Sequence, residues 1–203
     1  SFRIPGLPAE DFPALPTTTE PPALSIAQHT LKGLITKTMH AMSIEETRFI
    51  LNGALLAAQK GELVMVATDG RRLAAAHGPL SHPAKRPIHA VIPAKTIREL
   101  GRLLQEEETD DVTVTVLKEN QLAFRFGAVT VITRLIEGQF PPYEKVIPPP
   151  TNTTLTSNRQ ALTAAIRRAN LMTTATSQAV LFELSAARLT ISKESAELGS
   201  ARE

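Results

Sequence analysis

The sequence has 203 residues but no cysteine, no tryptophan and a single tyrosine. Without cysteine the chain can form neither disulfides nor thiolate metal sites, which favours a cytoplasmic over a secreted location. The scarcity of aromatic residues argues against a surface that stacks single-stranded bases. No apolar run approaches the roughly 20 residues that a membrane-spanning helix needs, and no signal peptide is recognisable.

A clear excess of positive or negative charge is also lacking. Lysine and arginine total 22 against 20 aspartates and glutamates, a formal net charge of +2. Any binding to nucleic acid must therefore come from where the cations lie and not from their number. Hydrophobic residues make up 42% of the chain and charged residues 21%, the balance of an ordinary globular protein.

An internal repeat is present instead. The proline-rich residues 1–23 resemble residues 133–148, about 128 positions later. Ser25-x-x-Gln28 and Ser157-x-x-Gln160 recur at a similar spacing, and each is typical of the capping box that opens a helix. We therefore predict three modules: the C-terminal tail of one in residues 1–20, a complete one in 21–149, and the truncated N-terminal part of a third in 150–203. The chain is expected to begin and end inside modules.

The complete module has an α+β pattern. Apolar periodicity predicts helices over residues 26–42 and 93–104, the second opening at a proline. Strands are predicted over residues 48–58, 62–68, 73–76, 87–92, 111–117, 121–126 and 129–135. Tight turns are expected at Glu119-Asn120 and at Gly127. The order predicts antiparallel sheet with helices covering one face.

Cations recur on the predicted helices, opposite the apolar side chains. In the second helix three cations at i, i+3 and i+7 lie opposite Ile97, Leu100 and Leu104. For one helix, a solvated face explains this pattern. Its recurrence in three helices favours a shared electronegative partner, and cations without interleaved aromatics suit phosphates. The outward cations are Lys32, Lys37, Lys95, Arg98, Arg102, Arg167 and Arg168.

An enzyme is the main alternative. Asp69, His77 and His82 could hold a metal in a small hydrolase or nuclease, but the two histidines lie among prolines with no matching carboxylate cluster. The acidic run over residues 106–111 could bind Mg²⁺, although such a run after a helix is usually a solvated turn. No phosphate-binding glycine loop or nucleophile elbow is found. We expect no catalytic residues, no metal and no cofactor.

Two motifs are more specific, ATDGRRLA over residues 67–74 and FPPYEKVIP over 140–148. With residues 49–53 and 91–95, in this order and spacing, the sequence resembles the β sliding clamp of bacterial DNA polymerase III. That family has three similar domains per subunit, which agrees with the repeat. The resemblance implies a DNA-clamp fold, with repeated modules of antiparallel sheet and two helices per module lining the inner face of a ring.

The resemblance also implies a function. A head-to-tail homodimer would encircle double-stranded DNA without sequence preference, and the seven outward cations would face it. The subunit would be an accessory of the DNA polymerase III holoenzyme without catalysis of its own. It would tether the polymerase, and peptides of clamp loaders and repair proteins would dock on it. Glu45 and Glu46, after the first helix, would repel phosphates. A peptide-binding module unrelated to DNA is a further alternative.

Family members bind these peptides in a hydrophobic pocket between the second and third domains. By position, one side of the pocket would comprise Arg48, Ile50, Leu51, Thr68, Gly70, Arg71, Arg72 and Leu73, and the opposite side Pro141, Lys145 and Val146. Ile50 stands where the family usually has an aromatic residue, and Lys145 where it has arginine. Without the resemblance, the leucines and Val146 would be interpreted as ordinary core residues.

Overall fold

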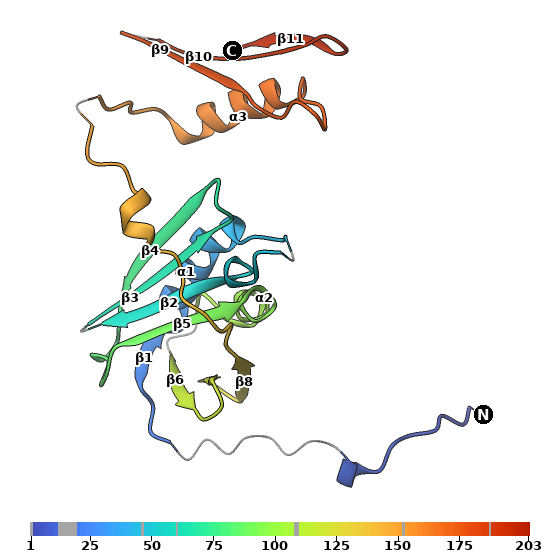
Figure 1. Ribbon diagram of the computed structural model, residues 1–203, viewed down its shortest axis with the longest axis vertical. Helices are drawn as coiled ribbons and strands as arrows, with labels where there is room; N and C mark the ends of the chain where they lie inside the picture. Colours follow the sequence, from blue (N-terminus) through green and yellow to red (C-terminus); the bar gives the residue numbers. More distant parts are fainter. Residues whose placement is uncertain are drawn as a thin grey trace. The chain divides into compact units, whose positions relative to one another are not determined.

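The computed structural model describes residues 2–11, 20–45, 47–59, 61–107, 110–151, 153–186 and 188–203. The chain divides into two compact units, Ser1–Ile147 and Pro148–Glu203, called unit 1 and unit 2 below (Figure 1). In the part of the chain that is described, no helix has the length and apolar character needed to span a membrane.

Unit 1 contains two four-stranded antiparallel sheets. Sheet A has the order β1-β6-β7-β8 and sheet B the order β4-β3-β2-β5. The strands of sheet A are β1 (Leu24–Ala27), β6 (Asp111–Leu117), β7 (Gln121–Phe126) and β8 (Val129–Arg134). Those of sheet B are β2 (Gly53–Gln59), β3 (Glu62–Thr68), β4 (Leu73–Pro79) and β5 (Ile88–Pro93). The predicted meander over residues 111–135 is confirmed, and its first turn has positive φ at Glu119 and Asn120.

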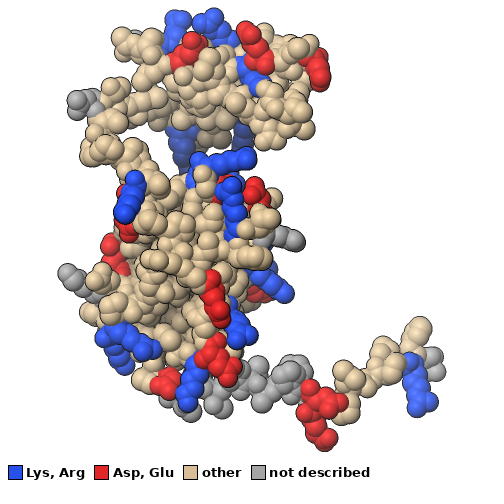
Figure 2. All heavy atoms as spheres, viewed as in Figure 1, with Lys and Arg blue, Asp and Glu red and all other residues tan. Residues whose placement is uncertain are grey.

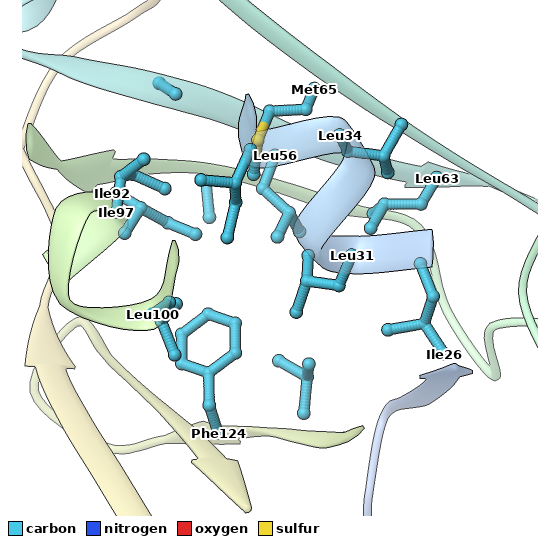
Figure 3. Close-up of a cluster of buried hydrophobic side chains, with 14 of the residues drawn as sticks. Ile26, Leu31, Leu34, Leu56, Leu63, Met65, Ile92, Ile97, Leu100 and Phe124 are labelled. Carbon is cyan, nitrogen blue, oxygen red and sulfur yellow. The ribbon is translucent and has the colours of Figure 1, made fainter. Parts of the chain in front are cut away.

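Two helices pack on one face of sheet B. These are α1 (Gln28–Thr38) and α2 (Ala94–Leu103), and short 3₁₀ turns lie at η1 (Ala9–Asp11), η2 (Met39–Ala41), η3 (Phe49–Leu51) and η4 (Tyr143–Val146). Figure 3 shows that side chains from both helices and both sheets converge on one core, with Leu31 of α1 and Leu100 of α2 near Phe124 of sheet A. The helices approach closely, because a Cβ added to Gly101 would lie only 3.1 Å from Ile35 Cγ2.

The first helix begins later than predicted, and its predicted capping box is wrong. Ser25 lies in β1, where its hydroxyl donates to the Asp111 carboxylate at 2.7 Å. The N-cap of α1 is Ala27, which makes no side-chain capping bond. Pairing of β1 with β6, a contact between residues far apart in sequence, therefore overrides the local pattern.

Unit 2 repeats the order of one helix followed by three antiparallel strands. Helix α3 (Arg159–Asn170) precedes β9 (Leu181–Ser185), β10 (Arg188–Ser195) and β11 (Gly199–Arg202), which form a sheet of order β11-β10-β9. Ala169 of α3 and Ile191 of β10 are buried. The cap of α3 is Asn158, whose Oδ1 accepts the Ala161 N–H at 3.0 Å, so the capping box predicted at Ser157 is also wrong. The predicted α+β class of repeated antiparallel modules is confirmed.

Candidate functional site

The exposed sides of α1 and α2 form one surface, called the helical surface below. The helices run antiparallel, since the Gln105 N–H after α2 donates to Gln28 Oε1 at the start of α1, while Gly101, earlier in α2, lies beside Ile35, later in α1. Their large apolar residues pack in or against the core, so their charged residues share the opposite side. On this side Lys37, Lys95 and Arg98 are exposed, as is Arg102, and Lys32 is half-buried. The cations predicted on these two helices therefore lie on adjacent elements of one surface.

Among the residues that the structure describes, one of these five cations is held in an ion pair. Arg102 binds the Glu99 carboxylate with both Nε and Nη2. This bond lowers the pKa of Glu99, and the nearby charges of Arg102 and Lys95 act in the same direction. Within the described residues, Lys32, Lys37, Lys95 and Arg98 form no ion pair with a carboxylate. Figure 2 shows how cations and carboxylates are interspersed on one face of the molecule.

The two arginines predicted to face outward on α3 differ from each other. Arg167 is exposed. Arg168 is clamped by Glu203, with Nε 2.8 Å from Oε1 and Nη2 2.7 Å from Oε2. Glu203 directly follows β11, so the Arg168 guanidinium lies beside the sheet and not away from it.

A second apolar cluster covers the opposite face of sheet B, and we call it the outer cluster. Its half-buried members include Ile136 and Tyr143, from the segment that follows sheet A, and Ile136 is tied to β5 by a backbone N–H to Val91 at 2.9 Å. Burial raises the pKa of Tyr143, and the neighbouring Glu144 adds to the shift. The buried members are Leu51, Leu55, Val66, Val91 and Phe140. Residues 136–143 therefore close over this face of the sheet.

Beside the outer cluster, the turn between β3 and β4 is organised by Asp69. Its Oδ1 accepts the backbone N–H groups of Arg71 and Arg72, at 2.9 and 3.0 Å, and Oδ2 accepts Arg72 Nε at 3.1 Å. These bonds, the two backbone ones first, lower the pKa of Asp69 to about 2. Arg48 Nη1 donates to the Asp69 carbonyl at 2.9 Å, and Gly70 has φ +87°. The Asp69 carboxylate therefore stabilises the turn, and Gly70, Arg71 and Arg72 in it are exposed to solvent.

The same turn involves Thr68, whose hydroxyl donates to the Arg72 carbonyl at 2.7 Å and accepts the Gly70 N–H at 3.1 Å. Glu45 lies 3.4 Å from Arg48 Nε, so its charge is directed at Arg48. Glu46, the second carboxylate that was expected to repel phosphates, lies outside the described residues.

The structure brings part of the predicted pocket together. Ile50, Leu51 and Leu73 share the outer cluster, and Arg48 adjoins the turn that carries Gly70. Arg71 and Arg72 are exposed at its rim. The residues predicted for the opposite side, Pro141, Lys145 and Val146, are exposed. Within the described residues, their side chains form no hydrogen bond or ion pair with the other predicted pocket residues.

Two residues of these surfaces were missed in the sequence. Phe140 is only 3% exposed and anchors residues 136–143 on the sheet, and its large apolar side chain among polar, glycine and proline residues could have shown it. Glu99 could have been found from its i, i+3 spacing to Arg102.

The metal-dependent alternative gains no support. Among the residues that the structure describes, no group of three or more His, Asp or Glu side chains is arranged to hold a metal. Asp69 is occupied by its own turn. His77, predicted in a loop, lies in β4 with Nδ1 3.4 Å from Glu62 Oε2. The backbone of His82 forms an isolated antiparallel β-bridge with Ser25.

Comparison with known proteins points to one family. The family model for the DNA polymerase III beta subunit, central domain, matches residues 25–142. The beta sliding clamp of Bacillus subtilis is 36% identical over 172 residues, covering 84% of this chain and 45% of that protein. That of Pseudomonas aeruginosa is 34% identical over 202 residues, covering 100% of this chain and 54% of that protein.

Solved structures agree with the sequence comparison. The B. subtilis sliding clamp superposes with a TM-score of 0.88 at 34% identity, over 97% of this chain and 52% of that one. The P. aeruginosa sliding clamp bound to griselimycin gives a TM-score of 0.86 at 35% identity, over 97% of this chain and 53% of that one. This chain spans about half the length of the curated relatives it matches. It has the sliding-clamp fold, and it belongs to the DNA polymerase III beta subunit family.

Proposed function

We propose that the chain serves as part of a DNA sliding clamp, a processivity factor that encircles duplex DNA and tethers the replicative polymerase. The observation that carries the proposal is the helical surface in a domain of this family. Four of its five cations are free of ion pairs, judged on the described residues. Such cations neutralise phosphates of any sequence, which permits movement along the duplex.

The proposal includes an assembly. Residues 21–149 are the complete central domain, 1–20 the tail of a preceding domain and 150–203 the opening part of a third. A head-to-tail homodimer closes the ring in the cytoplasm, with α1 and α2 toward the DNA. The chain acts as an accessory subunit of the polymerase and carries out no catalysis of its own.

The DNA contact is tested by binding the chain to a fluorescent 30-base-pair duplex at several salt concentrations. Non-specific affinities of this kind have Kd values of roughly 10⁻⁴–10⁻⁶ M, and each phosphate contact contributes about 0.9 to the slope of log K against log salt. Changing Lys95, Arg98 and Arg102 together to Gln lowers both affinity and slope. Changing Arg71, Lys118 and Lys145 to Gln removes the same charge away from the helices and serves as the control. Equal slopes for the two triple variants would refute the assignment.

We propose further that peptides of polymerases, clamp loaders and repair proteins dock beside the outer cluster. Ile50 and Leu73 supply half-buried apolar surface there, next to the rigid turn with its exposed arginines. Exposed apolar surface beside a few fixed polar groups suits an apolar peptide side chain.

Griselimycin is bound to the sliding clamp of P. aeruginosa in a solved structure, and it serves as the probe. Calorimetry should show binding to the chain that weakens in Leu73→Asp and Pro141→Ala. The change Leu117→Asp, at a half-buried position of β6 in sheet A, is the control for a charge placed outside the outer cluster. If both pocket variants bind griselimycin with the affinity of the parent chain, the proposed pocket is refuted.

A further inference from the structure

One carboxylate lies among the cations of the helical surface. Glu99 follows Lys95 by four residues and precedes Arg102 by three, so all three share one side of α2. Arg102 Nε donates to Glu99 Oε2 at 3.3 Å, and Nη2 donates to Oε1. The Glu99 and Arg102 side chains are 46% and 70% exposed. The ion pair therefore lies on the surface itself and not beneath it.

This pair changes what the surface offers to a phosphate. A guanidinium has five N–H donors in a planar fork, and Glu99 engages the edge that suits bidentate binding of an anion. Glu99 also offsets one positive charge and attracts Lys95. Since its pKa is lowered by these neighbours, Glu99 stays ionised at neutral pH.

We propose that Glu99 is a positioning residue that weakens the hold of the helical surface on DNA, by engaging Arg102 and offsetting its charge. Lys95 and Arg98 then carry the contact of α2 with the phosphates. The inference rests on the DNA-facing role proposed above. A protein that must move along a duplex is served by a weak contact, because every phosphate neutralised strengthens a hold that must be released at each step.

The test compares Glu99→Gln, Arg102→Gln and the double variant on the 30-base-pair duplex. Glu99→Gln binds more tightly, and its salt slope is steeper by about 0.9, the value of one added phosphate contact. Its advantage over the parent chain shrinks roughly three- to fourfold between 50 and 200 mM salt, as that slope requires. Arg102→Gln binds more weakly. The double variant matches the parent, because it replaces a neutral pair by two neutral side chains.

Two controls separate this effect from a change in folding or in net charge. Glu99→Asp keeps the negative charge and should restore the parent slope. Glu137→Gln makes the same change of charge in an exposed residue beside Ile136, on the far side of sheet B from the helices, and should leave the slope unaltered. Thermal unfolding of each variant confirms that it is folded.

The outcomes are distinguishable. A Glu99→Gln slope equal to that of the parent or of Glu137→Gln overturns the inference, as does a double variant as weak as Arg102→Gln. If Lys95→Gln lowers the slope while Glu99→Gln leaves it unchanged, the inference alone fails. If Lys95→Gln also has the parent slope, the proposed DNA-facing role fails and the inference with it.

Discussion

Gly70→Ala is the change that most directly tests the turn beside the outer cluster. Gly70 has φ +87°, a conformation that residues with a Cβ rarely adopt. A Cβ built at this position would lie 2.5 Å from Arg48 Nη1, the atom that donates to the Asp69 carbonyl. The substitution therefore strains the backbone and also displaces Arg48 from the turn.

The structure allows the size of the effect to be estimated. The left-handed conformation costs a residue with a Cβ roughly 1–2 kcal/mol. The clash adds little, because the Arg48 side chain is 45% exposed and can swing into solvent. We expect the free energy of unfolding to fall by about 1–2 kcal/mol. Griselimycin binding should weaken as well, since Arg48 leaves its place at the turn.

Urea unfolding and calorimetry with griselimycin measure the two effects. Gly33→Ala is the matched control, since Gly33 lies in α1 and a Cβ there meets no atom within 4 Å. In a helix this change should stabilise by roughly 0.5–1 kcal/mol, the opposite sign. An unfolding midpoint of Gly70→Ala equal to that of the parent, with unchanged binding of the probe, would refute the reasoning.

Three further predictions concern the core, the turn and the seam between the sheets. Phe124→Ala, at a fully buried position, should lower the free energy of unfolding by about 3–5 kcal/mol in urea. The pKa of Asp69, measured by NMR titration, should be about 2, and Arg72→Gln should raise it only in part because backbone bonds are the larger cause. Since this folded-state pKa is depressed, the stabilisation by Asp69 is present above about pH 4 and is lost as the pH falls through about 2. Asp111→Ala should cost about 1–3 kcal/mol in thermal unfolding, because the carboxylate accepts hydroxyl bonds from Ser25 and Ser81.

Local patterns predicted most of the elements. Strands β3, β6 and β7 have the predicted bounds, because an apolar run or an apolar alternation, with turn residues on either side, marks each of them without help from the rest of the chain. The apolar stripe of α2 likewise predicted its buried face, Ile97 and Leu100 included. Residues 48–52 were predicted as strand, but β2 begins only at Gly53 and Phe49–Leu51 form the turn η3, which places Leu51 in the outer cluster.

For the candidate site too, part could be predicted from the sequence and part required the structure. The sequence shows which cations are opposite the core, but it does not show that Arg102 and Arg168 are each engaged by a carboxylate. Glu203 lies 35 residues from Arg168, so only the packing of α3 against its sheet brings them together. The predicted pocket residues came from family resemblance, and the anchoring of residues 136–143 by Phe140 needed the folded sheet.

The sequence by itself determined the α+β class, the buried face of α2 and the family, because each depends on residue type and short-range spacing. Tertiary structure decided which polar groups meet. It placed Ser25 in a strand bonded to Asp111 and not at a helix cap, and it set α1 beside α2. The physical reason is that hydrogen bonds and ion pairs depend on distances of a few ångströms between residues that the chain separates by many positions.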